Sequence, residues 1–239
     1  MPYYFYGFDW TYLYIVLPCF ILAIIASSRV NSTFKRYSKQ MSSRRITGSD
    51  AAEQVLHANG VADVRIERVS GNLTDHYDPK ANVIRLSDAV YNSTSTAAIG
   101  VACHEAGHAV QYAREYFPIK VRAAIIPATN IGSKLAMPLI LLGILFASVG
   151  NYSYTLVYLG IAMFALSLVF QLVTLPVEFN ASRRAMEAIK STQLLTEEEQ
   201  KGARKTLTAA AMTYVAAVAV SAAQLLRLIL LFGGRRRND

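Results

Sequence analysis

Three long stretches of this chain carry no charged side chain, and they limit the possible folds more than any other feature. They lie between Asp9 and Arg29, from Leu135 to Val177 and from Thr206 to Leu226. A helix needs about 20 apolar residues to cross the hydrocarbon layer of a bilayer. Each stretch is long enough for a crossing, and the middle one is long enough for two. The chain is therefore predicted to be a mainly α-helical membrane protein.

The three stretches predict separate membrane segments. Residues 1–28 are expected to form an N-terminal anchor, since their aromatic-rich start is typical of a membrane interface. Residues 134–176 are expected to form a transmembrane hairpin that turns near Asn151. The segment 206–239 combines an apolar helix with a basic tail. That helix either crosses the membrane or packs on a soluble domain, so three and four spans both stay open.

The remaining residues, 29–133 and 177–205, are polar enough for one small soluble domain of about 100 residues. Alternating apolar and polar residues at Val64–Val69 and a short apolar run at Val83–Leu86 predict a small antiparallel sheet with a long loop. A helix is expected from about residue 95 to residue 116, after capping residues at Asn92-Ser93-Thr94. The expected fold class is an α+β domain attached to membrane helices.

Basic residues give the chain a formal net charge of +8. They flank the apolar stretches and end in Arg235-Arg236-Arg237, as the positive-inside rule predicts for a membrane protein. The expected partner is therefore a lipid bilayer and not a nucleic acid. The soluble domain is expected on the cytoplasmic side, with the N-terminus outside.

The sequence His104-Glu105-Ala106-Gly107-His108 lies within the expected helix 95–116. Residues four apart share a helix face, so His104 and His108 can direct both imidazoles at one metal ion. Glu105 can then act on a water at that metal. This spacing is typical of zinc hydrolases, in which the glutamate is the general base.

A catalytic zinc usually has three protein ligands and a water. A third histidine further along the same helix is excluded, because Gln111 and Arg114 stand where glycine and histidine would be needed. Glu178 is the best candidate, since the expected hairpin returns the chain to the side of the histidines just before it. His57 and His76 remain alternatives.

The motifs of this chain resemble those of known membrane metallopeptidases. The pair H-E-A-G-H and, after a hairpin, E-F-N-A-S is similar to the gluzincin pattern of HtpX-type enzymes. The likeness is stronger to the bacterial YugP-type neutral zinc metallopeptidases, through H-Y-D-P, A-C-H-E-A-G-H-A-V-Q, L-P-V-E-F-N-A-S-R-R-A and A-M-T-Y-V-A-A. The resemblance implies a gluzincin-like domain with one zinc ion per chain.

The resemblance also implies roles for individual residues. His104, His108 and Glu178 would be the zinc ligands, and Glu105 the catalytic base. HtpX-type enzymes have an aspartate at the position of Ser182, so that serine, or Asn180, is the candidate for orienting a zinc-bound histidine. By likeness to gluzincins, the strand Val83–Leu86 would offer an edge to an extended substrate. The candidate oxyanion donors are His76, Tyr77 and Tyr214.

The sequence thus predicts an integral-membrane, zinc-dependent metalloendopeptidase. It would act from the cytoplasmic side of the bacterial inner membrane on proteins or peptides in or near that membrane. Two alternatives are an intramembrane protease and a non-catalytic metal-binding membrane scaffold. Polar residues along 104–116 favour a helix at the interface over one inside the bilayer. No oligomeric state is predicted.

Overall fold

The computed structural model describes residues 4–5, 8–146 and 152–233. The chain divides into two compact units. The helical unit comprises Met1–Ile25, Val121–Leu175 and Thr213–Asp239, and the mixed unit comprises Ala26–Lys120 and Pro176–Met212. The expected basic tail 235–237 and the expected turn at Asn151 lie outside the described residues.

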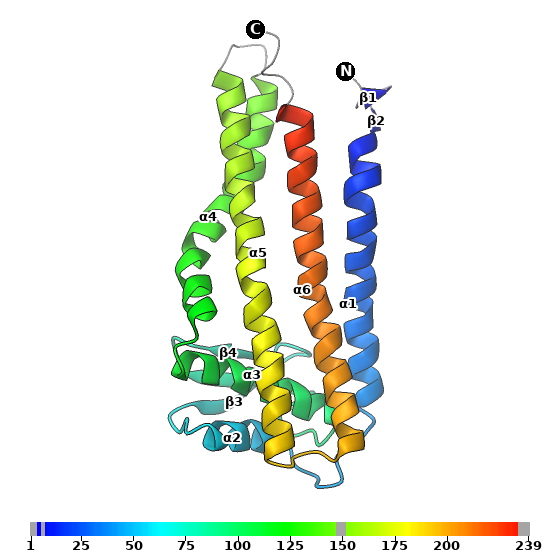
Figure 1. The fold of residues 1–239 in the computed structure, drawn as a ribbon, viewed down its shortest axis with the longest axis vertical. Helices are drawn as coiled ribbons and strands as arrows, with labels where there is room; N and C mark the ends of the chain where they lie inside the picture. Colours follow the sequence, from blue (N-terminus) through cyan, green and yellow to red (C-terminus); the bar gives the residue numbers. More distant parts are fainter. Residues whose placement is uncertain (1–3, 6–7, 147–151, 234–239) are drawn as a thin grey trace. The chain divides into compact units, whose positions relative to one another are not determined.

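Four long helices dominate the described chain (Figure 1). They are α1 (Leu17–Tyr37), which follows the short π-helix η1 (Tyr12–Val16), α4 (Phe117–Leu145), α5 (Tyr152–Ser191) and α6 (Glu197–Phe232). All four are long and apolar enough to cross a membrane. The candidate spans therefore include the last apolar stretch, which the sequence left undecided between a span and a packed helix.

The helix boundaries differ from those expected. Helix α1 continues through the basic segment to Tyr37, and α4 begins at Phe117, well before residue 134. Helix α5 runs without a break through Pro176, so the second apolar run of the expected hairpin and Glu178 belong to one helix. Proline removes one helical hydrogen bond, but long apolar helices tolerate this loss when neighbouring groups satisfy the freed carbonyl.

Within the helical unit, α4 and α5 approach closely at a glycine. A Cβ atom added at Gly160 would lie 2.7 Å from the carbonyl oxygen of Ala136. Small residues at such crossings let two helices pack backbone against backbone, which is typical of membrane helices. Near the N-terminus, the short strands β1 (Tyr4–Phe5) and β2 (Phe8–Asp9) pair antiparallel, and Asp9 forms an ion pair with Arg227 of α6.

The mixed unit contains a three-stranded sheet in the order β3-β5-β4. Strand β3 (Arg65–Val69) pairs parallel with β5 (Val83–Ser87), and β4 (His76–Asp78) pairs antiparallel with β5. The predicted antiparallel sheet is therefore wrong, because the sheet is mixed. The short β4 lies hidden among turn-forming residues, and it takes the antiparallel place beside β5 that the sequence suggested for β3.

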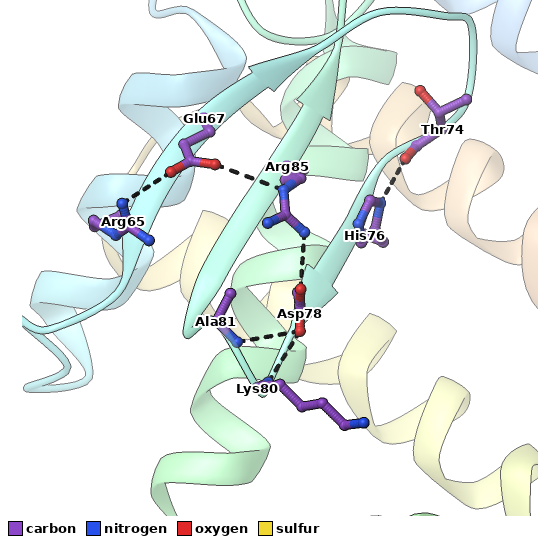
Figure 2. A network of polar contacts seen from close by, with 8 residues as sticks. All are labelled: Arg65, Glu67, Thr74, His76, Asp78, Lys80, Ala81 and Arg85. Carbon is purple, nitrogen blue, oxygen red and sulfur yellow. Dashed lines mark hydrogen bonds and ion pairs between the residues drawn. The ribbon is translucent and has the colours of Figure 1, made fainter. Parts of the chain in front are cut away.

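Strand β5 is the central strand, so it has no free edge for a substrate. Arg85 at its middle forms ion pairs in both directions, with Glu67 of β3 at 3.6 Å and with Asp78 of β4 at 2.9 Å (Figure 2). Asp78 also accepts the backbone N–H groups of Lys80 and Ala81, which shapes the turn into β5. The edges of the sheet are β3 and β4.

Two capped helices pack against this sheet in the mixed unit (Figure 1). Helix α2 (Gly48–Ala58) begins at a capping box made by Thr47 and Asp50. Helix α3 (Thr96–Ala113) begins at Ser95, whose hydroxyl accepts the N–H of Ala98. This agrees with the helix predicted near 95–116. Helix α3 is buried over most of its length, so the residues that it carries are held rigidly.

Candidate metal centre

Helix α3 presents His104 and His108 on one face, as their spacing predicts. Their rings lie 4.7 Å apart, centroid to centroid. Glu178 comes from α5, and its carboxylate is almost fully buried, with a side-chain exposure of 3%. Each of the three residues offers one ligand atom, and these atoms lie within 4.8 Å of one another. His57 and His76 are not members of this cluster.

The distances in this cluster suit a zinc ion. Oε2 of Glu178 lies 3.3 Å from Nε2 of His104 and 3.5 Å from Nε2 of His108. With zinc–ligand bonds of about 2.0–2.1 Å and tetrahedral angles, two ligand atoms lie about 3.3 Å apart. Both histidines face the carboxylate with the same ring nitrogen. Two histidines and a glutamate are also a donor set found in catalytic zinc sites, which keep a fourth position for water.

The two halves of the cluster meet where α3 has a glycine. A Cβ atom added at Gly107 would lie 2.8 Å from the carbonyl oxygen of Ala181 in α5. Any larger residue at position 107 would therefore push the two helices apart. The glycine at position 107 therefore permits the close contact between α3 and α5.

Charge and burial act together on His108. Burial disfavours the charged imidazolium, but the contact with Glu178 and the negative charge of Glu105 outweigh it, so the pKa of His108 is raised. Glu105 itself is 8% exposed and lies on the same helix. Glu178 and Glu105 thus favour a positive charge at His108, and a metal cation bound to the cluster would also supply a positive charge there.

Asp75 is a neighbour of the site that the sequence did not reveal. Its carboxylate accepts the backbone N–H of Ser87 at 2.7 Å and the Ser87 hydroxyl at 3.0 Å. Burial raises the pKa of Asp75, and the negative charge of Glu105 adds to this effect. The turn-rich segment around Asp75 gave no sign of such a role, since aspartate is common in turns for local reasons.

The Nδ1 atoms of the two histidines have separate partners. Oγ of Ser182 lies 3.2 Å from Nδ1 of His104, and the orienting role expected for Ser182 stays a prediction. Oε1 of Gln111 lies 3.0 Å from Nδ1 of His108. Asn180 contacts Gln111 and no histidine in the described hydrogen bonds. Polar residues along 104–116 had suggested a helix at the membrane interface. Gln111 is one of these residues, but its side chain is fully buried and does not face water.

Two of the three candidate oxyanion donors, His76 and Tyr77, have other contacts. His76 is exposed, and its Nδ1 lies 2.8 Å from the carbonyl oxygen of Thr74 (Figure 2). The Tyr77 hydroxyl donates to Asn82 at 2.7 Å, and its ring lies against that of Tyr112. Tyr214 belongs to the helical unit. The roles predicted for these three residues therefore stay predictions.

A cavity of about 370 Å³ lies beside the metal-ligand cluster, between α5 and α6 of the mixed unit. Ser182, the partner of His104, is one of its lining residues. Apolar and basic side chains line the rest, among them Phe179, Met186, Leu207, Met212, Arg183 and Arg204.

The donor set and the adjacent Glu105 define a site of the zinc hydrolase class. A family model described as "Putative neutral zinc metallopeptidase" matches residues 12–233. The chain is also 43% identical to "Putative membrane protease YugP" of Bacillus subtilis (strain 168), over 95% of this chain and 99% of that protein. No solved structure matches the chain. The chain belongs to this family of zinc metallopeptidases, which confirms the resemblance seen in its motifs.

Proposed function

We propose that this protein is an integral-membrane zinc endopeptidase of the gluzincin type. His104, His108 and Glu178 hold one zinc ion, and Glu105 is the general base. The observation that carries the proposal is the position of the Glu178 carboxylate, 3.3 Å and 3.5 Å from the two histidine nitrogens. Family membership and the membrane protease relative support the zinc metallopeptidase activity in this proposal.

Zinc bound by these ligands supplies a Lewis acid that makes water nucleophilic near neutral pH. Glu105 takes the proton from the attacking water and passes it to the leaving amine of the peptide. Its near-complete burial keeps competing water away from this carboxylate. Ser182 and Gln111 hold the two imidazoles from behind, so that each Nε2 faces the metal position.

The proposed substrates are proteins in or close to the membrane. Glu178 directly follows Val177, the last residue of the uncharged run 135–177. The four long apolar helices support a multi-pass protein. By the positive-inside rule, the basic residues beside the apolar runs put the active site on the cytoplasmic side of the bacterial inner membrane. With β5 central in the sheet, the substrate-pairing strand is proposed to be the edge strand β4 instead.

Replacing Glu105 tests the proposal. Glu105→Gln removes the base but leaves both histidines and Glu178 in place, so zinc should still bind. Hydrolysis of an unfolded protein by the purified, zinc-loaded chain should fall by about 10²–10⁴-fold. Glu115→Gln is a matched control, because Glu115 is exposed beyond the end of α3 and pairs with Lys120. Full proteolysis by Glu105→Gln would contradict the mechanism, and zinc binding without turnover by the unaltered chain would favour a scaffold.

A further inference from the structure

Gln111 is a fully buried polar residue one turn beyond the second histidine on α3. Its amide nitrogen donates to the carbonyl oxygen of Val177 at 2.8 Å and to Oδ1 of Asn180 at 3.0 Å. Its amide oxygen lies 3.0 Å from Nδ1 of His108. All three contacts are internal, and two of them reach across to α5. A buried side chain satisfied so completely is held in one orientation.

The direction of each hydrogen bond in this network is fixed by groups that have only one role. Arg184 can only donate, and its Nε lies 2.8 Å from Asn180, so the atom of Asn180 at that contact is the oxygen. That oxygen, like the carbonyl of Val177, can only accept from Gln111. Both amide hydrogens of Gln111 are therefore used, and its oxygen must face His108.

We infer that Gln111 is a positioning residue that fixes the tautomer of His108. An amide oxygen can only accept, so Nδ1 of His108 must carry the proton. The lone pair of the neutral ring then lies on Nε2, the atom that faces Glu178. The network Arg184–Asn180–Gln111 prepares His108 as a metal ligand before the metal arrives. This inference rests on the proposed zinc site.

The partner of His104 lacks this directionality. Ser182 has a hydroxyl, which can donate or accept, so it can orient the ring but does not select a tautomer. The two ligands on α3 are thus held in different ways. His108 is the ligand whose protonation pattern the fold dictates.

The same network also positions Glu178. Its two anchors on α5, Val177 and Asn180, lie immediately before and two positions after this ligand. The Gln111 amide therefore ties α3 to the turn of α5 that supplies the third ligand. Removing it should loosen both the ring of His108 and the turn that carries the carboxylate.

The test measures zinc affinity of the full-length chain in detergent by competition with a chelator. Gln111→Met keeps the length of the side chain but removes the amide. It should weaken zinc binding about 10–100-fold, as expected for the loss of a partner behind a metal ligand. In zinc-loaded protein with isotope-labelled histidine, the Nδ1–H signal of His108 should be protected from exchange, and this protection should be lost in the variant.

Matched variants separate positioning from general destabilisation. Thr206→Val removes another buried polar group of the mixed unit, whose hydroxyl donates to Gly202, and it should leave zinc affinity unchanged. Asn180→Asp keeps an acceptor for Gln111 and Arg184. Asn180→Leu removes that acceptor and should bind at least fivefold more weakly than Asn180→Asp.

The inference is overturned if Gln111→Met binds zinc within twofold of the unaltered chain and keeps His108 protected. It is also overturned if Thr206→Val loses as much affinity as Gln111→Met. Should Gln111→Met fail to fold, the two Asn180 variants decide, and equal affinities overturn the inference. An unaltered chain that binds no zinc would overturn the proposed function itself, which these other outcomes leave intact.

Discussion

Gly107 of α3 packs directly against the backbone of Ala181 in α5, and this contact brings the two halves of the candidate metal centre together. A Cβ atom added at position 107 would lie only 2.8 Å from the carbonyl oxygen of Ala181, which is too close for normal packing. The glycine is unfavourable for the helix by itself, by about 1 kcal/mol relative to alanine. The glycine stands where close contact between α3 and α5 sets the distances between the candidate ligands.

Gly107→Ala should therefore destabilise the protein despite the better helix propensity of alanine. Overpacking of this kind costs roughly 1–3 kcal/mol, and the displaced α5 should also weaken zinc binding. Thermal unfolding and chelator competition measure the two effects. Gly160→Ala is the matched control, since it meets the Ala136 carbonyl oxygen at 2.7 Å within the helical unit. It should lower stability and leave zinc affinity intact. Unchanged zinc affinity in Gly107→Ala would show that the helix contact does not set the site.

Glu178→Gln should abolish tight zinc binding. The amide keeps the shape of the side chain but removes the only negative charge among the three ligand side chains, which partly offsets the two positive charges of the metal in a buried site. Metal content after dialysis, measured by elemental analysis, should fall from one zinc per chain to a small fraction. Glu187→Gln, an exposed position on the same helix that pairs with Arg183, should retain its zinc. A zinc-loaded Glu178→Gln protein would remove Glu178 from the ligand set.

In the metal-free protein, Asp75 should make the free energy of unfolding vary with pH in the acidic range. Burial raises the pKa of this carboxyl group in the folded state. A carboxyl with a raised folded pKa stabilises the fold below its unfolded pKa of about 4, and that contribution is lost as the pH rises through the folded value. Asp75→Asn cannot titrate. The unfolding midpoint of Asp75→Asn minus that of the unaltered chain should therefore increase as the pH rises from about 4 to the folded pKa of Asp75. A difference that is constant with pH would contradict the assignment.

The Asp9–Arg227 pair should stabilise the helical unit. Both side chains are 19% exposed, and Nε of Arg227 donates to Asp9 at 2.8 Å. Asp9→Asn leaves a partly buried arginine without its counter-charge and should cost roughly 1–3 kcal/mol. Arg227→Met should cost a similar amount. The double variant should lose clearly less than the sum, which a double-mutant cycle of unfolding free energies would measure. Strict additivity would show that the pair contributes nothing.

The sequence by itself determined the features that depend on local spacing. The uncharged stretches indicated long apolar helices, and the spacing of His104 and His108 placed both on one helix face, because helical periodicity is a property of the chain alone. The order of apolar and polar segments also made Glu178 the best candidate for the third ligand, with His57 and His76 as alternatives. The motifs were sufficient to recognise the family.

Only the tertiary structure decided how distant segments combine. The three residues of β4 are too short to stand out among turn formers, so the mixed order β3-β5-β4 could not be read from alternation. Gln111 and Asp75 look like ordinary polar residues in sequence, and Asn180, a candidate for orienting a histidine, instead accepts from Gln111. Their roles depend on which atoms burial brings within hydrogen-bonding distance, and that is set by the packing of α3 against α5 and of β4 against β5.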